Sequence, residues 1–166
     1  MLCAITPWAV SVPAFRAVGI RTRTSNPAEA DPATARIGAL WDRFFSESWE
    51  HKLPPPGDDG RVFGVYSHYA SDQHGEFDVL AGVAAPSDHQ AMPGASAVDI
   101  EAGTYLVFES EGHMPQLVID AWTAVWHYFA ANPQVQRRFD TDFEAYSGPY
   151  QVAIHIGIYE SGAVPR

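Results

Sequence analysis

The sequence has little cysteine and no long apolar run, and each shortage narrows what the protein can be. Cys3 is the single cysteine among 166 residues, so no intramolecular disulfide can form, and we expect a protein of the reducing cytoplasm. No stretch reaches the roughly 18 apolar residues that a membrane span requires. The start of the chain also lacks the basic and apolar regions of a signal peptide. We therefore expect neither export nor membrane insertion.

Basic residues are scarce as well. Lys and Arg total 10 against 20 Asp and Glu, which gives a formal charge of −10. A surface of this sign repels phosphate backbones and attracts cations, which disfavours a nucleic-acid reader, although the same charge also serves plain solubility. What the sequence has in quantity is apolar and aromatic residues, 46% and 13%, as in a protein with a packed core. The length predicts a single domain, residues 1–166.

The chain shows the same succession of elements twice: strand, helix, strand, strand. Alternating residues predict the strands, and apolar residues at helical spacing predict one amphipathic helix in each half. In the first half we predict a strand at 13–24, a helix at about 33–51, and a hairpin of strands at 62–69 and 76–85. In the second half we predict a strand at 104–110, a helix at 114–132, and strands at 139–147 and 152–159. The proline-rich stretch 54–60 and the small, polar stretch 86–97 are predicted to be a loop and a connector.

Two short patches match between the halves, in the same order. Leu40–Phe44 in the first helix resembles Val125–Phe129 in the second, and Phe63–Ser67 in the following strand resembles Phe143–Ser147. These matches indicate duplication of a βαββ unit, with repeat 1 at about 13–85 and repeat 2 at about 98–160. Because one such unit cannot bury both sides of its sheet, we expect two units packed about a pseudo-twofold axis. The predicted fold is α+β: an antiparallel sheet with two main helices and a central ligand groove.

The repeat, the Trp-bearing second helix, the segment Asp142-Phe143-Glu144-Ala145-Tyr146 and the closing strand Val152–Ile158 together resemble the gyrase-inhibitor-like effector-binding domains. Domains of this family form the sensing half of many AraC-type and MerR-type regulators and also occur alone. The resemblance implies paired βαββ units, a groove for lipophilic cations, and an acidic residue on the strand after the second helix, which is Glu144 here. Because the residues before Val12 leave no room for a helix-turn-helix, the chain is similar to the stand-alone, integron cassette drug-binding form.

Glu144 is the candidate at the centre of the predicted groove. Strand alternation places Glu144 and Tyr146 on one face of the sheet, with Phe143 and Ala145 on the other. A carboxylate among aromatic rings suits a delocalised cation, because the rings offer cation–π surface and the carboxylate supplies the countercharge. Repeat 1 has Gly64 at the equivalent position, which predicts one acid per groove. An isolated strand glutamate is usually solvated, so the repeat and the family position are what favour the groove.

Aromatic residues complete the predicted site. Tyr66 and Tyr146 are equivalent in the two repeats, so either both line the groove or both are core residues, and we favour lining. The helix tryptophans lie on apolar faces, where core and groove wall are both open, and Phe108 is a further candidate for the wall. The predicted ligand-binding residues are Glu144, Tyr146, Tyr66, Trp126, Trp122, Trp41 and Phe108.

The sequence shows no motif for catalysis, metal or cofactor. Ser67 and His68 are adjacent on a strand and point to opposite faces, which argues against a nucleophile and its base. Glu109, Glu111 and His113 alternate at a strand end, and this pattern fits a solvated face better than a metal site. No phosphate-binding or dinucleotide fingerprint is present. We therefore expect no metal and no cofactor.

These observations favour a binding protein for small lipophilic cations, more than an enzyme. Two alternatives stay open. One is a hydrolase on the same scaffold, in which Glu144 orients or activates water, since the resemblance includes some relatives that hydrolyse reactive cyclopropane-bearing compounds. The other is a gyrase-inhibitor-like protein-interaction module that acts through its acidic surface. The expected partner is a small lipophilic cation, with a protein partner as a further option, and with neither nucleic acid nor membrane.

Overall fold

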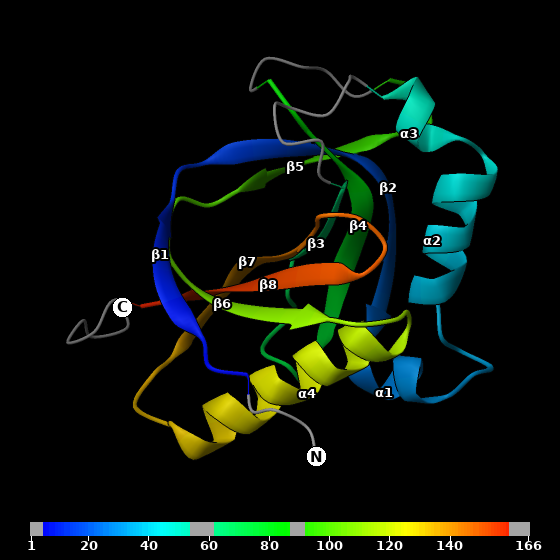
Figure 1. The fold of residues 1–166 in the computed structure, drawn as a ribbon. Coiled ribbons are helices and arrows are strands. Elements are labelled where there is room, and N and C mark those ends of the chain that lie inside the picture. Colours follow the sequence, from blue (N-terminus) through cyan, green and yellow to red (C-terminus); the bar gives the residue numbers. More distant parts are fainter. Residues whose placement is uncertain (1–4, 54–61, 87–91, 160–166) are drawn as a thin grey trace.

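The computed structural model describes residues 5–53, 62–86 and 92–159, so the predicted loop at 54–60 lies outside it. Within these ranges, eight strands form one antiparallel sheet (Figure 1). The strands are β1 (Trp8–Val12), β2 (Phe15–Ser25), β3 (Val62–Ser67), β4 (Glu76–Ala85), β5 (Ser96–Ile100), β6 (Gly103–Glu111), β7 (Arg137–Tyr146) and β8 (Gln151–Ile158). The helices are α1 (Asn26–Ala30), α2 (Ile37–Ser46), α3 (Trp49–Lys52) and α4 (Gln116–Ala131). The predicted α+β class is confirmed.

The order of strands in the sheet reveals the duplication. Across the sheet the order is β1-β6-β8-β7-β3-β4-β2-β5. It is a palindrome in which β6, β8 and β7 of the second half mirror β2, β4 and β3 of the first. The edge strands β1 and β5 complete the symmetry. Two βαββ units related by a pseudo-twofold axis are therefore present, as the sequence predicts.

The pseudo-twofold axis passes through the pairing of β3 with β7. Gly64 lies opposite Glu144, and the flanking pairs are Tyr66 with Asp142 and Val62 with Tyr146. A twofold axis must pair equivalent residues with each other at its centre, and Gly64 and Glu144 are equivalent in the strand alignment. The structure therefore agrees with that alignment and places Glu144 at the symmetry axis.

The sheet is strongly curved, because a very short connection joins its two ends. β1 is one edge strand and β2 lies next to the opposite edge, yet only Pro13 and Ala14 separate them in the chain. In Figure 1 the blue chain runs from β1 directly into β2. One face of the sheet therefore closes around a buried cluster that includes Phe63, Val65 and Phe143. This cluster contains the strand face that points away from Glu144.

The other face of the sheet carries the main helices (Figure 1). α2 packs on β2 and β4 through Leu40 and Phe44, and α4 packs on β6 and β8 through Leu117, Ala121 and Val125. Because each helix covers outer strands of its own repeat, the central strands β3 and β7 lie between the two helices. No helix in the described ranges is long and apolar enough to cross a membrane.

Three local predictions are corrected by the structure. The predicted helix at 33–51 is divided, since α2 ends at Ser46 and Ser48 has a φ of 55° before α3 begins. A left-handed residue cannot continue a right-handed helix. No strand was expected where β1 lies, and β5 begins within the stretch 86–97 that was expected to be a connector. Both are short edge strands, and five residues show too little alternation to be recognised.

Candidate functional site

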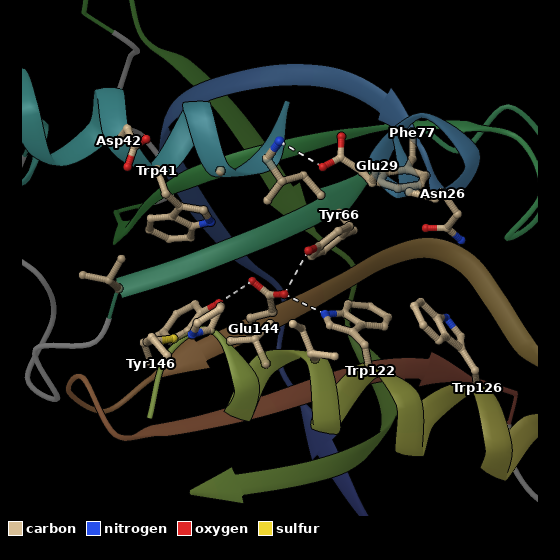
Figure 2. Close-up of a pocket in the computed structure, with 18 of the residues that line it drawn as sticks. Asn26, Glu29, Trp41, Asp42, Tyr66, Phe77, Trp122, Trp126, Glu144 and Tyr146 are labelled. Carbon is tan, nitrogen blue, oxygen red and sulfur yellow. Dashed lines mark hydrogen bonds between the residues drawn. The ribbon is translucent and has the colours of Figure 1, made fainter. Parts of the chain in front are cut away.

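A cavity of about 1100 Å³ lies between α2 and α4, above the central strands (Figure 2). Trp41 and Phe45 from α2 face Trp122 and Trp126 from α4 across it. These four side chains follow from helical periodicity, because residues four apart in a helix lie on the same side, one above the other. The walls of the cavity are therefore largely aromatic. We call this cavity the groove.

Glu144 lies at the floor of the groove with its carboxylate raised toward the helices (Figure 2). The side chain is buried, with 1% of its surface exposed. Tyr66 Oη and Trp122 Nε1 donate hydrogen bonds to Oε2 at 2.9 and 2.7 Å, and Tyr146 Oη donates to Oε1 at 2.8 Å. The three donors come from β3, α4 and β7, so the carboxylate is oriented by both repeats at once.

The charge of this carboxylate is the main electrostatic feature of the site. Burial raises the pKa of Glu144, and the hydrogen bonds from Trp122, Tyr146 and Tyr66 oppose that rise. Burial and the neighbouring Glu144 also raise the pKa of both tyrosines well above the ordinary value, so they stay protonated donors. All three donors are neutral, and in the described part of the chain no Lys, Arg or His forms an ion pair with Glu144. When it is ionised, its negative charge is oriented but not neutralised.

The prediction of one acid per groove is corrected, because Glu29 and Asp42 also line the groove. Gly64 explains why the two central strands β3 and β7 supply the groove with one acid and not two. A Cβ atom at this position would lie 2.5 Å from Glu144 Oε1 and 3.2 Å from Trp41 Cζ2. Because the symmetry axis brings residues 64 and 144 face to face, the two positions compete for the same space. The missing side chain in repeat 1 leaves room for the carboxylate from repeat 2.

Each tyrosine pairs with a tryptophan of the opposite repeat. Tyr146 packs edge-on against Trp41 with ring centroids 5.5 Å apart, and Tyr66 packs in the same way against Trp122 at 5.1 Å. Since the tyrosines are equivalent, Trp41 corresponds to Trp122, and Phe45 then corresponds to Trp126. The alignment of Trp41 with Trp126 predicted from sequence is therefore wrong by about one helical turn. The error arises because residues four apart share a helix face and show the same apolar pattern.

The structure brings most of the predicted site residues together. Glu144, Tyr146, Tyr66, Trp126, Trp122 and Trp41 all line the groove. Phe108 does not line it and is instead fully buried beneath α4, against Tyr128 and Phe129. The reason is its strand: β6 is covered by α4, whereas the groove lies above β3 and β7. That the six lining residues bind a ligand stays a prediction.

Sequence reasoning missed several groove residues. Phe45 follows Trp41 by four residues, so helical periodicity could have identified it. Phe77 and Tyr69 reach the groove from β4 and the turn after β3, and Arg137 reaches it from the start of β7. No sequence signal distinguishes these three from core or surface residues. Their positions depend on how the strands pair.

The sequence predicts that Glu109, Glu111 and His113 form a solvated face and not a metal site, and the structure shows their contacts. Within residues 5–53, 62–86 and 92–159, no three His, Cys, Asp or Glu side chains are placed to hold a metal ion. Glu109 and Glu111 each accept a hydrogen bond from Gln151, and His113 packs against the ring of Tyr150.

A comparison with known protein families assigns the chain. Residues 10–159 match the profile of Cass2, described as integron-associated effector binding protein. The chain belongs to this family. An integron cassette protein from the mobile metagenome of Vibrio cholerae, VCH_CASS2, is 35% identical, with a TM-score of 0.80 over 92% of this chain and 95% of that one. The family and this relative agree with the resemblance inferred from sequence.

More distant structures share the fold. SAV2435, solved with bound tetraphenylphosphonium, is 18% identical, with a TM-score of 0.77 over 93% of this chain and 94% of that one. The C-terminal domain of EcmrR is 10% identical, with a TM-score of 0.62 over 96% of this chain and all of that one. No match is found among the curated proteins. At these identities the two structures establish a common architecture.

Proposed function

We propose that this protein binds small hydrophobic cations in the groove, with Glu144 as their countercharge. The observation that carries the proposal is the buried carboxylate of Glu144. It accepts hydrogen bonds from three neutral donors, and no cation among the described residues pairs with it. Leaving an uncompensated charge in an apolar site is unfavourable, and a bound cation removes that cost. A sheet with a purely structural role does not need a buried carboxylate arranged in this way.

The walls of the groove suit the same guest. Trp41, Phe45, Trp122 and Trp126 present ring faces and edges around the carboxylate, and aromatic faces attract delocalised cations. Two comparisons support this function: the chain belongs to an effector-binding family, and SAV2435, which shares its fold, was solved with tetraphenylphosphonium.

The first test is a calorimetric titration with tetraphenylphosphonium. We expect saturable one-to-one binding to the wild type, and Glu144→Gln should weaken it roughly tenfold to hundredfold, or about 1.4 to 2.7 kcal/mol. Glutamine keeps the shape of the side chain and can still accept a hydrogen bond from Trp122, so the loss of affinity reports the missing charge more than changed packing. The matched control is Glu109→Gln, which removes an exposed charge outside the groove and should leave the dissociation constant within about twofold. Unchanged affinity in Glu144→Gln would show that the carboxylate is not the countercharge.

A neutral probe separates charge recognition from burial of apolar surface. Triphenylphosphine oxide offers similar phenyl rings without a net charge, and we expect it to bind the wild type more weakly than the phosphonium. Glu144→Gln should change its affinity little. Equal affinity of the wild type for both probes would limit the proposal to a hydrophobic site without preference for cations.

The hydrolytic alternative has less support from the geometry. Both oxygens of Glu144 already accept hydrogen bonds, which suits a fixed countercharge better than a base that must take a proton from water. Incubation with a cyclopropane-bearing alkylator distinguishes the two functions, because a binding protein returns the compound intact and an enzyme yields the ring-opened product.

A further inference from the structure

The groove continues beyond Trp126 into a second cavity of about 710 Å³. The two cavities share four lining residues: Asn26, Gln73, Trp126 and Arg137. Phe129 and Phe139 line the second cavity and do not line the groove. Arg137 and Trp126 therefore stand at the boundary, where a ligand held in the groove can reach into the second cavity.

Arg137 is a buried cation placed between rings. Its side chain is 8% exposed, and its guanidinium carbon lies 4.3 Å from the centroid of Phe139 and 5.9 Å from that of Phe129. Nη2 donates to Asp142 Oδ2 at 2.8 Å. Nε is enclosed by protein atoms, so a ligand cannot reach it, whereas Nη1 is not enclosed and donates no hydrogen bond in the part of the chain that the structure describes. A guanidinium carries five N–H donors, so Arg137 retains unused donors at Nη1 while it lines both cavities.

The surrounding charges decide which acceptor suits this position. Asp142 is fully buried and already balances the positive charge of Arg137. Glu144 and Glu29 also line the groove. A second anion would therefore meet an excess of carboxylates, whereas a neutral oxygen accepts a hydrogen bond without that repulsion.

The spacing fits a single ligand. Asp142 and Glu144 are two residues apart on one strand, so their Cα atoms are about 7 Å apart, and both side chains leave the same face. Arg137 donates to Asp142, so its guanidinium lies beside the residue that is one such step along β7 from Glu144. An arm of one aromatic ring or a short chain spans a distance of this order.

We propose that Arg137 forms a second subsite of the groove, which binds a neutral carbonyl oxygen, such as that of an amide or ketone, carried by the cationic ligand. The subsite rests on the proposed function, because the cation at Glu144 brings the carbonyl to Arg137. The ligand class is thus narrowed from lipophilic cations to those that carry a hydrogen-bond acceptor about one ring away from the charge.

The test compares two phosphonium probes of nearly equal shape, (4-carbamoylbenzyl)triphenylphosphonium and (4-isopropylbenzyl)triphenylphosphonium. Calorimetry on the wild type should show the amide binding roughly tenfold more tightly, as expected for a hydrogen bond to a charged donor. The double variant Arg137→Met with Asp142→Asn removes the ion pair at constant net charge and should abolish this preference. The readout is the ratio of the two affinities within the same protein, so a change in the groove that alters the binding of both probes equally does not affect it.

The matched control is the neighbouring pair. Arg138 and Asp140 also form an ion pair, at 3.3 Å, and line neither cavity. Arg138→Met with Asp140→Asn should therefore keep the preference for the amide. If the Arg137 variant does not fold, guanidinium resonances of the wild type provide the readout, because those of Arg137 should shift with the amide probe and stay in place with the isopropyl probe.

The outcomes separate the two proposals. If neither probe binds the wild type, the proposed function fails and the subsite fails with it. If both bind equally, or if the preference survives in the Arg137 variant, the subsite is wrong and cation binding at Glu144 stands. If the control pair loses the preference as well, the effect is not specific to Arg137, and the subsite is again wrong.

Discussion

At the scale of single residues, the site depends on the contrast between Glu144 and Gly64. One residue supplies a buried carboxylate and the other supplies the space that it occupies. Tyr66, Tyr146 and Trp122 then fix the carboxylate without neutralising it. Fixed polar groups in a dry site act strongly on a guest, because little reorganisation is needed when the guest binds.

Gly64→Ala tests whether that space is required. The added methyl group would lie 2.5 Å from Glu144 Oε1, so the carboxylate must move or the strands must separate. We expect a loss of about 1 to 3 kcal/mol of unfolding free energy and weaker cation binding. Urea denaturation measures the first and calorimetry the second. In a Glu144→Ala background, Gly64→Ala should lower the unfolding free energy clearly less. An equal loss in both backgrounds would mean that the carboxylate is not what fills the space.

The raised pKa of Glu144 predicts opposite effects of pH on binding and on stability. Cation binding needs the ionised form, so affinity should rise as pH rises through the pKa of the folded protein and then level off. The unfolding free energy of the ligand-free protein changes with pH in the opposite direction. Between the ordinary pKa of the unfolded chain and the raised value, the folded state holds more protons, so this group's contribution falls as pH rises.

Titrations and urea denaturation across about pH 4 to 8 measure both effects, with Glu144→Gln as reference because it cannot titrate. The difference in unfolding free energy between wild type and variant should change with pH only between the ordinary pKa of the unfolded chain and the raised pKa of Glu144. A difference that is constant across the range would show that the carboxyl group keeps its ordinary pKa.

At the scale of elements, the two helices are symmetric in position and unequal in detail. Trp41 and Phe45 of α2 correspond to Trp122 and Trp126 of α4, and by the same alignment Gly38 corresponds to Ile119. Gly38 lines the groove, and a Cβ atom built there meets nothing within 4 Å. The groove is therefore more open on the α2 side than on the α4 side.

Two substitutions at Gly38 test this opening. Gly38→Ala should stabilise α2 by up to about 1 kcal/mol, because glycine is a poor helix former, and it should leave binding within about twofold. Gly38→Phe places a ring in the open side and should weaken the binding of tetraphenylphosphonium severalfold while the protein stays folded. Thermal unfolding and calorimetry measure these effects. Unchanged affinity in Gly38→Phe would mean that the guest does not use this side of the groove.

At the scale of the whole molecule, the groove belongs to both repeats. The strands β3 and β7 that form its floor come from different halves, and so do the helices that form its walls. The hydrogen bonds to Glu144 join β3, α4 and β7. A site on a pseudo-twofold axis is complete only when both halves are folded and paired.

This arrangement predicts that residues 1–166 unfold as a single domain. The tryptophans report on both halves, with Trp41 and Trp49 in the first and Trp122 and Trp126 in the second. We expect urea transitions followed by tryptophan fluorescence and by far-ultraviolet circular dichroism to coincide. Two separated midpoints would show that the repeats unfold independently, against the single-domain prediction.

The sequence alone determined the class of fold, the duplication, the strand alignment that pairs Gly64 with Glu144, and six of the residues that line the groove. Alternation and helical spacing are visible in neighbouring residues, and the duplication is visible as matching patches in the two halves of the chain, so neither needs knowledge of how the strands pair. Only the tertiary structure decided that Phe108 lies under α4, that Trp41 corresponds to Trp122, and that Arg137 borders the groove. A helix keeps its apolar face when it slides by one turn along a sheet, so its position is set by the side chains that it packs against and not by its own pattern.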